Sequence, residues 1–140
     1  MGGVTGRCAC GAVRYASAVD PLMALHCQCR DCQRDSGTGH SCHVMLPKSL
    51  LNLPGNLKRY ESVADNGNPV YRGFCPECGS SVTYGTAAFP DEVFVTAGSL
   101  DDPSWFKPVI VVYASSAQPW DHVDRSLPRF QEMPPLERTE

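Results

Sequence analysis

The chain has 140 residues, the usual length of one domain, and its 42% hydrophobic content is enough for a modest core. Its formal net charge of −3 argues against a nucleic-acid partner, because nucleic-acid-binding surfaces carry a basic stripe. It contains no apolar run of about 18 residues, the length that would predict a membrane-spanning helix. We therefore expect a single domain over residues 1–140, with a core over about 6–134 and with neither nucleic acid nor membrane as a partner.

The N-terminal segment Met1–Arg7 lacks the apolar stretch of a secretory signal peptide, so we expect a cytoplasmic, reducing location. In such a compartment, clustered cysteines more often bind metal or carry out redox chemistry than form disulfides. A disulfide framework is the alternative, since the chain has 8 cysteines, an even number. A thioredoxin-like role for Cys75–Cys78 fits less well, because the strand-like Val82–Tyr84 follows where a helix is needed.

β-Branched and aromatic residues gather in short segments separated by turns rich in Gly, Pro, Asn and Asp. The predicted strands are Ala12–Tyr15, His43–Leu46, Leu57–Glu61, Val70–Phe74, Val82–Tyr84, Val93–Thr96 and Val109–Tyr113. With 12 Gly and 12 Pro, helix is limited to a turn or two near Asp31–Ser36 and Ser49–Leu51. This pattern predicts a mostly β domain with short sheets and a fraying tail over Met133–Glu140.

The cysteines carry the strongest functional signal in the chain. Most of them fall into three tight clusters, Cys8–Cys10, Cys27–Cys32 and Cys75–Cys78. A C-x-C pair and a distant C-x-x-C pair together supply four thiolates, and the remaining C-x-C-x-x-C supplies three. Closed four-ligand zinc sites are usually structural, whereas three-ligand sites with an open position are usually chemical. We therefore expect two Zn²⁺ ions per chain, one structural and one in a reactive site.

The predicted structural zinc site consists of Cys8, Cys10, Cys75 and Cys78. Sulfurs around tetrahedral zinc lie about 3.8 Å apart. Residues i and i+2 of an extended strand point the same way, and a C-x-x-C brings its sulfurs together by wrapping a tight turn. Such a site closes a long loop and stabilises the folded chain. The alternative is two unrelated pairs of buried thiols.

The predicted reactive site consists of Cys27, Cys29 and Cys32, which can share one metal and leave a position open for a substrate thiol. Metal coordination would deprotonate that thiol and hold it as a nucleophile. The alternative is a second closed site whose fourth ligand is one of His26, His40, Cys42 and His43. If none of them is a ligand, Cys42 is a small core residue, and His26 contacts the metal ligands without binding the metal. His40 and His43 are then acid–base groups or ordinary core or solvated histidines.

Three motifs resemble those of the glutathione-dependent formaldehyde-activating enzyme family, which also includes centromere protein V. The motifs are Cys8-Ala9-Cys10-Gly11-Ala12-Val13, the segment His26–Gly37 and Phe74-Cys75-Pro76-Glu77-Cys78-Gly79-Ser80. Gly98–Asp102 and Trp120-Asp121 resemble weaker C-terminal features of the family, so the resemblance runs from about Gly6 to Pro134. The order and spacing of these motifs are specific for the family but not for its substrate.

The resemblance implies an all-β fold of several antiparallel sheets stapled by zinc, sometimes called a β-tent. It implies the same division of ligands that the spacing predicts: structural zinc on Cys8, Cys10, Cys75 and Cys78, and reactive zinc on Cys27, Cys29 and Cys32. The named activity of the family joins glutathione and formaldehyde into S-hydroxymethylglutathione, which is classed as a carbon–sulfur lyase reaction.

We therefore expect a zinc-dependent carbon–sulfur lyase that acts on glutathione or another small thiol and on formaldehyde or a related electrophile. Arg30 and Arg34 flank the cysteines and are candidates to bind the carboxylates of glutathione. Because thiols add to formaldehyde without a catalyst, a non-catalytic zinc-dependent glutathione- or protein-binding module is the alternative. Edge strands of a small β domain would also allow a homodimer.

Overall fold

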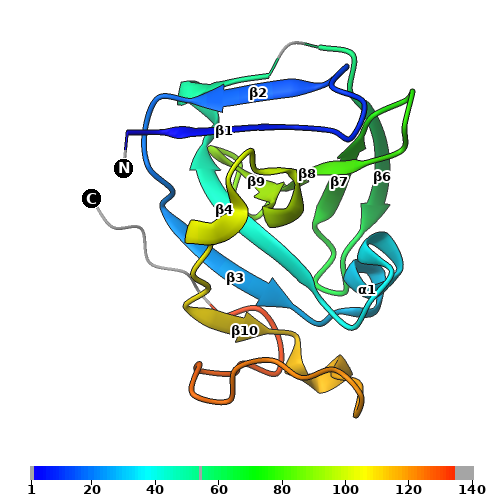
Figure 1. Ribbon diagram of the computed structural model, residues 1–140. Coiled ribbons are helices and arrows are strands. Elements are labelled where there is room, and N and C mark those ends of the chain that lie inside the picture. Colours follow the sequence, from blue (N-terminus) through cyan, green and yellow to red (C-terminus); the bar gives the residue numbers. More distant parts are fainter. Residues whose placement is uncertain (1, 54, 135–140) are drawn as a thin grey trace.

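The computed structural model describes residues 2–53 and 55–134, and its strands form two sheets (Figure 1). The smaller sheet has the order β1-β2-β5, with β1 Val4–Arg7, β2 Arg14–Ser17 and β5 Leu51–Asn52. The larger sheet has the order β10-β3-β4-β9-β8-β7-β6. Its strands are β3 Met23–Cys27, β4 Ser41–Pro47, β6 Lys58–Val63, β7 Pro69–Phe74, β8 Ser81–Thr86, β9 Glu92–Thr96 and β10 Ile110–Val112. The described pairings are antiparallel, except that β10 runs parallel to β3.

Helical structure in the described residues is short. The α-helix α1 spans Arg30–Ser36 and ends at Gly37, which adopts the left-handed conformation with φ 78° that glycine tolerates best. The 3₁₀ turns are η1 Lys48–Leu50, η2 Ala97–Ser99, η3 Pro103–Trp105 and η4 Ala114–Ser116. Over residues 2–53 and 55–134, no helix has the length and apolar character needed to cross a membrane.

Consecutive residues of strand β4 are buried. Because successive side chains of a strand point to opposite sides of the sheet, β4 is covered on both faces. Val44 and Leu46 face the smaller sheet and join the core cluster between the two sheets. Met45 faces the other way and packs with Phe94 and Leu25 in a second core cluster. The central strands of the larger sheet therefore separate two buried regions, and each region contains its own group of chemically reactive side chains.

The predicted mostly β fold is confirmed, and the helical turn expected near Asp31–Ser36 corresponds to α1. The strands gather into two sheets, the larger of which includes one parallel pair. Sequence reasoning missed β1, β3 and β5, since β3 and β5 contain no β-branched or aromatic residue and β1 has only four residues. In the predicted fraying tail, residues 135–140 lie outside the described part of the chain.

Candidate functional site

Two groups of cysteine side chains have the arrangement of metal sites. The four-thiol cluster is Cys8, Cys10, Cys75 and Cys78, and the three-thiol cluster is Cys27, Cys29 and Cys32. Within each cluster the sulfur atoms all lie within 4.8 Å of one another. The structure therefore brings together both sets of residues that the spacing grouped.

The four-thiol cluster joins the loop after β1 to the loop after β7. The Sγ atoms of Cys8 and Cys10 lie 3.7 Å apart, and those of Cys10 and Cys75 lie 3.8 Å apart. These separations match the roughly 3.8 Å between sulfurs around tetrahedral zinc. Cys8 and Cys75 are buried in the core between the sheets, whereas Cys10 and Cys78 are exposed. The donor set and its spacing are thus suited to zinc.

Backbone hydrogen bonds shape each of these loops around its sulfurs. In the first loop, the amide of Val13 donates to the Sγ of Cys8 at 3.2 Å. In the second, Gly79 has φ 77° and donates to the carbonyl of Cys75 at 2.8 Å, which closes the turn. Hydrogen bonds from Ser80 lower the pKa of Cys78 to about 5, so this thiol loses its proton readily.

The three-thiol cluster lies where β3 gives way to α1. Cys27 ends the strand, Cys29 caps the helix, and Cys32 lies in the first helical turn. The Sγ of Cys29 accepts a hydrogen bond from the amide of Cys32 at 3.1 Å. This short strand-to-helix turn is sufficient to bring the three sulfurs together without help from a distant segment.

The thiols of this cluster change one another's acidity. Contact with the thiols of Cys27 and Cys29 lowers the pKa of Cys32, because they donate to its thiolate. Contact with the thiol of Cys29, and then with that of Cys32, raises the pKa of Cys27. Cys32 is therefore the position in the cluster where negative charge is most stable.

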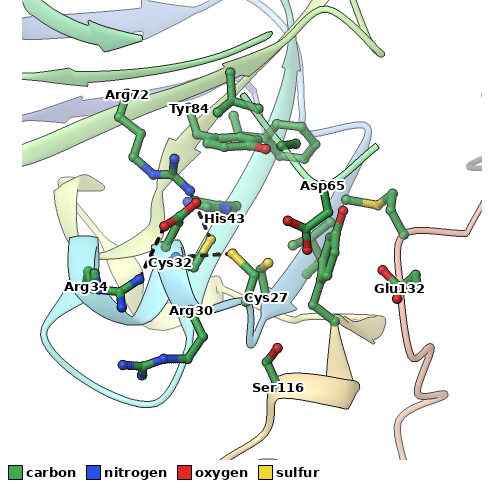
Figure 2. A pocket seen from close by; sticks show the side chains of 18 of the residues that line it. Cys27, Arg30, Cys32, Arg34, His43, Asp65, Arg72, Tyr84, Ser116 and Glu132 are labelled. Carbon is green, nitrogen blue, oxygen red and sulfur yellow. Dashed lines mark hydrogen bonds and ion pairs between the residues drawn. The ribbon is translucent and has the colours of Figure 1, made fainter. Parts of the chain in front are cut away.

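A cavity of about 350 Å³ opens directly over the three sulfurs. Figure 2 shows Cys27 and Cys32 on one side of it, Arg72 and Tyr84 above them, and Asp65 and Glu132 across from them. The guanidinium of Arg72 lies 3.6 Å from the Sγ of Cys32 and 5.0 Å from the ring centre of Tyr84. The cavity thus combines nucleophilic sulfur with a buried cation.

Two buried nitrogens in the wall of this cavity have unused hydrogen-bonding capacity. His43 Nε2 and Arg72 Nε have no hydrogen-bond partner in the described part of the chain. His43 is 3% exposed and stacks on Tyr84, and burial lowers its pKa, which favours the neutral ring. Since buried polar groups are normally paired, these atoms indicate a polar ligand.

The charged side chains around the cavity carry both signs. Arg30 and Arg34, the candidates for binding carboxylates, line it, and Arg72 adds a third cation. Asp31, Asp65 and Glu132 supply the acidic groups. Arg34 lies 3.5 Å from Asp31 in an exposed ion pair, whereas the guanidinium of Arg72 lies 3.6 Å from the Sγ of Cys32. A small zwitterion would find partners for both of its charges here.

The residues weighed as a fourth ligand separate into two places. His43 lines the cavity, and it packs there as a buried core histidine. His26, His40 and Cys42 instead form a group of their own on the opposite face of the sheet, with ligand atoms within 4.8 Å of one another. Burial lowers the pKa of His26 to about 4 and raises that of Cys42 to about 11.

Sequence reasoning missed several residues of the cavity, chiefly Arg72, Tyr84 and Asp65. They come from β7, from β8 and from the turn before β7. No local pattern marks them, because only the order of strands in the sheet brings them to the cysteines.

The comparison with solved structures gives a fold relative from Rhodobacter sphaeroides, a protein known by its crystal structure. It is 24% identical to this chain, with a TM-score of 0.56 over 69% of this chain and 87% of the other. At this identity the match supports the fold alone.

The family comparison covers most of the chain. The model of the glutathione-dependent formaldehyde-activating enzyme matches residues 3–116, a span that includes both cysteine clusters and most of the cavity. The chain therefore belongs to the family of glutathione-dependent formaldehyde-activating enzymes.

Proposed function

We propose that this protein is a zinc-dependent carbon–sulfur lyase that joins glutathione and formaldehyde into S-hydroxymethylglutathione. The observation that carries this proposal is the three-thiol cluster at the base of a cavity of about 350 Å³ with two unpartnered buried nitrogens in its wall. Membership of the family supports the choice of reaction. A related glutathione conjugate would use the same cavity.

The two cysteine clusters would hold two zinc ions in different roles. Cys8, Cys10, Cys75 and Cys78 offer four sulfurs and leave no position open, so we assign them a structural ion. Cys27, Cys29 and Cys32 offer three sulfurs beside the cavity, so we assign them the reactive ion. A zinc ion bound there would supply an open position that lowers the pKa of an entering thiol and orients its sulfur.

The charges around the cavity suit glutathione, which has two carboxylates and one ammonium group. Arg72 would bind one carboxylate or the developing negative charge beside Cys32, and Arg30 would bind another at the entrance. Asp65 or Glu132 would bind the ammonium group, which shares a carbon with one of the two carboxylates and therefore lies at the same end of the tripeptide. The cavity would thereby fix the tripeptide at both ends and hold its sulfur at the cluster.

The reaction forms one bond and moves one proton. The sulfur of glutathione adds to the carbon of formaldehyde, the π electrons move to the oxygen, and the proton lost by the thiol balances the charge there. We assign His43 to hydrogen-bond this oxygen through the unpartnered Nε2, in the tautomer whose Nδ1 accepts from the hydroxyl of Ser41, 3.5 Å away. A neutral ring whose Nδ1 accepts from Ser41 carries its proton on Nε2.

The test is the exchange rate among glutathione, formaldehyde and S-hydroxymethylglutathione, measured by magnetisation-transfer NMR with and without the zinc-loaded protein. Because the addition also occurs without a catalyst, the protein-free rate is the reference. We expect an acceleration that is lost in Cys29→Ser and kept in the control His122→Ala, whose side chain lies outside both clusters.

Calorimetry separates this reaction from simple binding. Glutathione that binds to the wild-type protein without accelerating the exchange would contradict the enzymatic proposal and favour a zinc-dependent binding module. S-Methylglutathione, which has no free thiol, is the matched ligand control. Weak binding of this analogue, together with tight binding of glutathione, would support capture of the substrate through its sulfur.

A further inference from the structure

The group formed by His26, His40 and Cys42 lies back to back with the three-thiol cluster. His26 on β3 pairs directly across from Cys42 on β4. Because strand side chains alternate, His26 points away from its neighbour Cys27, and Cys42 points away from His43. Cys42 accordingly packs against the core between the sheets, whereas Cys27 belongs to the second core cluster. No single ion can therefore serve both groups.

The spacing of the three side chains fits a small metal ion. His26 Nδ1 and Cys42 Sγ lie 3.3 Å apart, and all three ligand atoms lie within 4.8 Å of one another. Sulfur and nitrogen ligands of tetrahedral zinc lie about 3.5 Å apart. The rings of His26 and His40 meet edge to face with centroids 4.7 Å apart. Only small side-chain movements would bring the three atoms onto one ion.

A buried carboxylate fixes the orientation of His40. Asp121 has a side chain that is 5% exposed, and its oxygens lie 2.8 and 2.9 Å from Nδ1 of His40. This contact leaves Nε2 of His40 as the free nitrogen. Metal-binding histidines commonly donate their second N–H to a carboxylate in this way, which sets the tautomer and strengthens the ligand.

The fold also holds Asp121 itself in place. Gln28, which is fully buried, donates through Nε2 to an oxygen of Asp121 at 3.0 Å. Gly39 leaves the space for this carboxylate, because a Cβ at Gly39 would collide with the side chain of Asp121. The arrangement around His40 is thus built from three separate segments of the chain rather than from one flexible surface loop.

We propose that His26, His40 and Cys42 form a third metal site, for a divalent cation of the zinc class, with Asp121 orienting His40. Two imidazoles and one thiolate are ligands typical of zinc. One thiolate and one Zn²⁺ give a local charge of +1, which the carboxylate of Asp121 balances. The fourth position is left for water. This site is independent of the reaction proposed for the three-thiol cluster.

The test counts metal ions in the full-length, zinc-reconstituted protein by native mass spectrometry. We expect three per chain in the wild type and two in Cys42→Ala, with three kept in His122→Ala. His26→Phe is the second variant, because a phenyl ring can keep the edge-to-face contact that His26 makes with Phe106. Circular dichroism verifies that each variant is folded.

Cadmium NMR shows which site is lost. The chemical shift of bound cadmium rises with the number of sulfur ligands, so the wild type should give three resonances, and Cys42→Ala should lose the one at lowest shift. Two ions in the wild type, or a third ion that survives both substitutions, would overturn the proposal. Loss of a resonance from a sulfur-rich site instead would also overturn it.

Discussion

The four-thiol cluster joins two loops whose cysteines lie 65 residues apart, whereas the three-thiol cluster comes from one stretch between β3 and α1. Two thiols of the first are buried in the core between the sheets. The second faces a cavity of about 350 Å³. The difference teaches that a cluster that closes a long loop can stabilise the fold. A local cluster can instead leave one coordination position of its metal open for a substrate.

The largest expected effect is a difference in thermal stability between variants of the two clusters. We expect Cys78→Ser to lower the melting temperature by more than about 10 °C, because it removes a ligand from a site that links distant segments. We expect Cys29→Ser to lower it by less than about 4 °C while losing one zinc ion. Differential scanning calorimetry with zinc analysis measures both. Equal melting temperatures for the two variants would break the distinction between structural and reactive clusters.

Removal of zinc by a chelator should also distinguish the three-thiol cluster from the four-thiol cluster. In excess chelator, we expect the ion of the three-thiol cluster to leave before that of the four-thiol cluster and with no change in circular dichroism, because its open position lets the chelator attack. The ion of the four-thiol cluster should leave only as the protein unfolds. A chromogenic chelator and far-ultraviolet dichroism follow the two events together. Unfolding that coincides with release of the ion from the three-thiol cluster would contradict this order.

Arg72 should affect ligand binding at the three-thiol cluster alone. We expect Arg72→Met to weaken glutathione binding about tenfold, since it removes a charge-assisted hydrogen bond but keeps most of the side-chain stem. Arg72→Lys should restore part of the affinity. Arg59→Met, at an exposed position on β6, is the control. Calorimetric titration measures the three variants, and an unchanged affinity in Arg72→Met would remove this residue from the binding site.

The smallest effects should come from glycines beside the clusters. Gly37 and Gly79 have φ of 78° and 77°, and an added Cβ would meet no atom within 4 Å at either position. Each change to Ala should therefore cost about 1 kcal/mol from the backbone alone. We expect Gly37→Ala to speed zinc release from the three-thiol cluster, and Gly79→Ala to speed it from the four-thiol cluster.

Gly67 is the matched control for these glycines. It has φ of 86° and equally open surroundings, and its turn contains none of the clustered cysteines, although Asp65 of the same turn lines the cavity. Gly67→Ala should lower the free energy of unfolding in urea by a similar amount without changing either release rate. A faster release in this variant would show that global stability, rather than the local turn, controls the zinc.

The sequence predicted the two clusters well because their spacing is a local property. Cys27, Cys29 and Cys32 need only a strand end and one helical turn, and each half of the four-thiol cluster needs only one tight loop. The motifs also identified the family, and the match over residues 3–116 confirms it. Strand β3 escaped prediction because its residues, Met-Ala-Leu-His-Cys, have no marked β-propensity.

The remaining site residues depend on long-range pairing. Arg72 reaches Cys32 because β7 and β8 lie in the same sheet as β3 and curve toward α1 (Figure 1). His40 contacts Asp121, which lies 81 positions away in the sequence, and no pattern in either segment predicts the contact. Such contacts depend on strand order and register, which spacing and composition do not specify.

Strand β3 places His26 and Cys27 on opposite faces of one sheet, and this has a consequence for how the gene can change. Insertion or deletion of a single codon within β3 would exchange the two faces along part of the strand. Imidazole would then point into the cavity and thiol into the core between the sheets. Substitutions can alter one face and spare the other, but a length change here disrupts both at once. We expect natural length variation in this protein to fall in its loops and not in this strand.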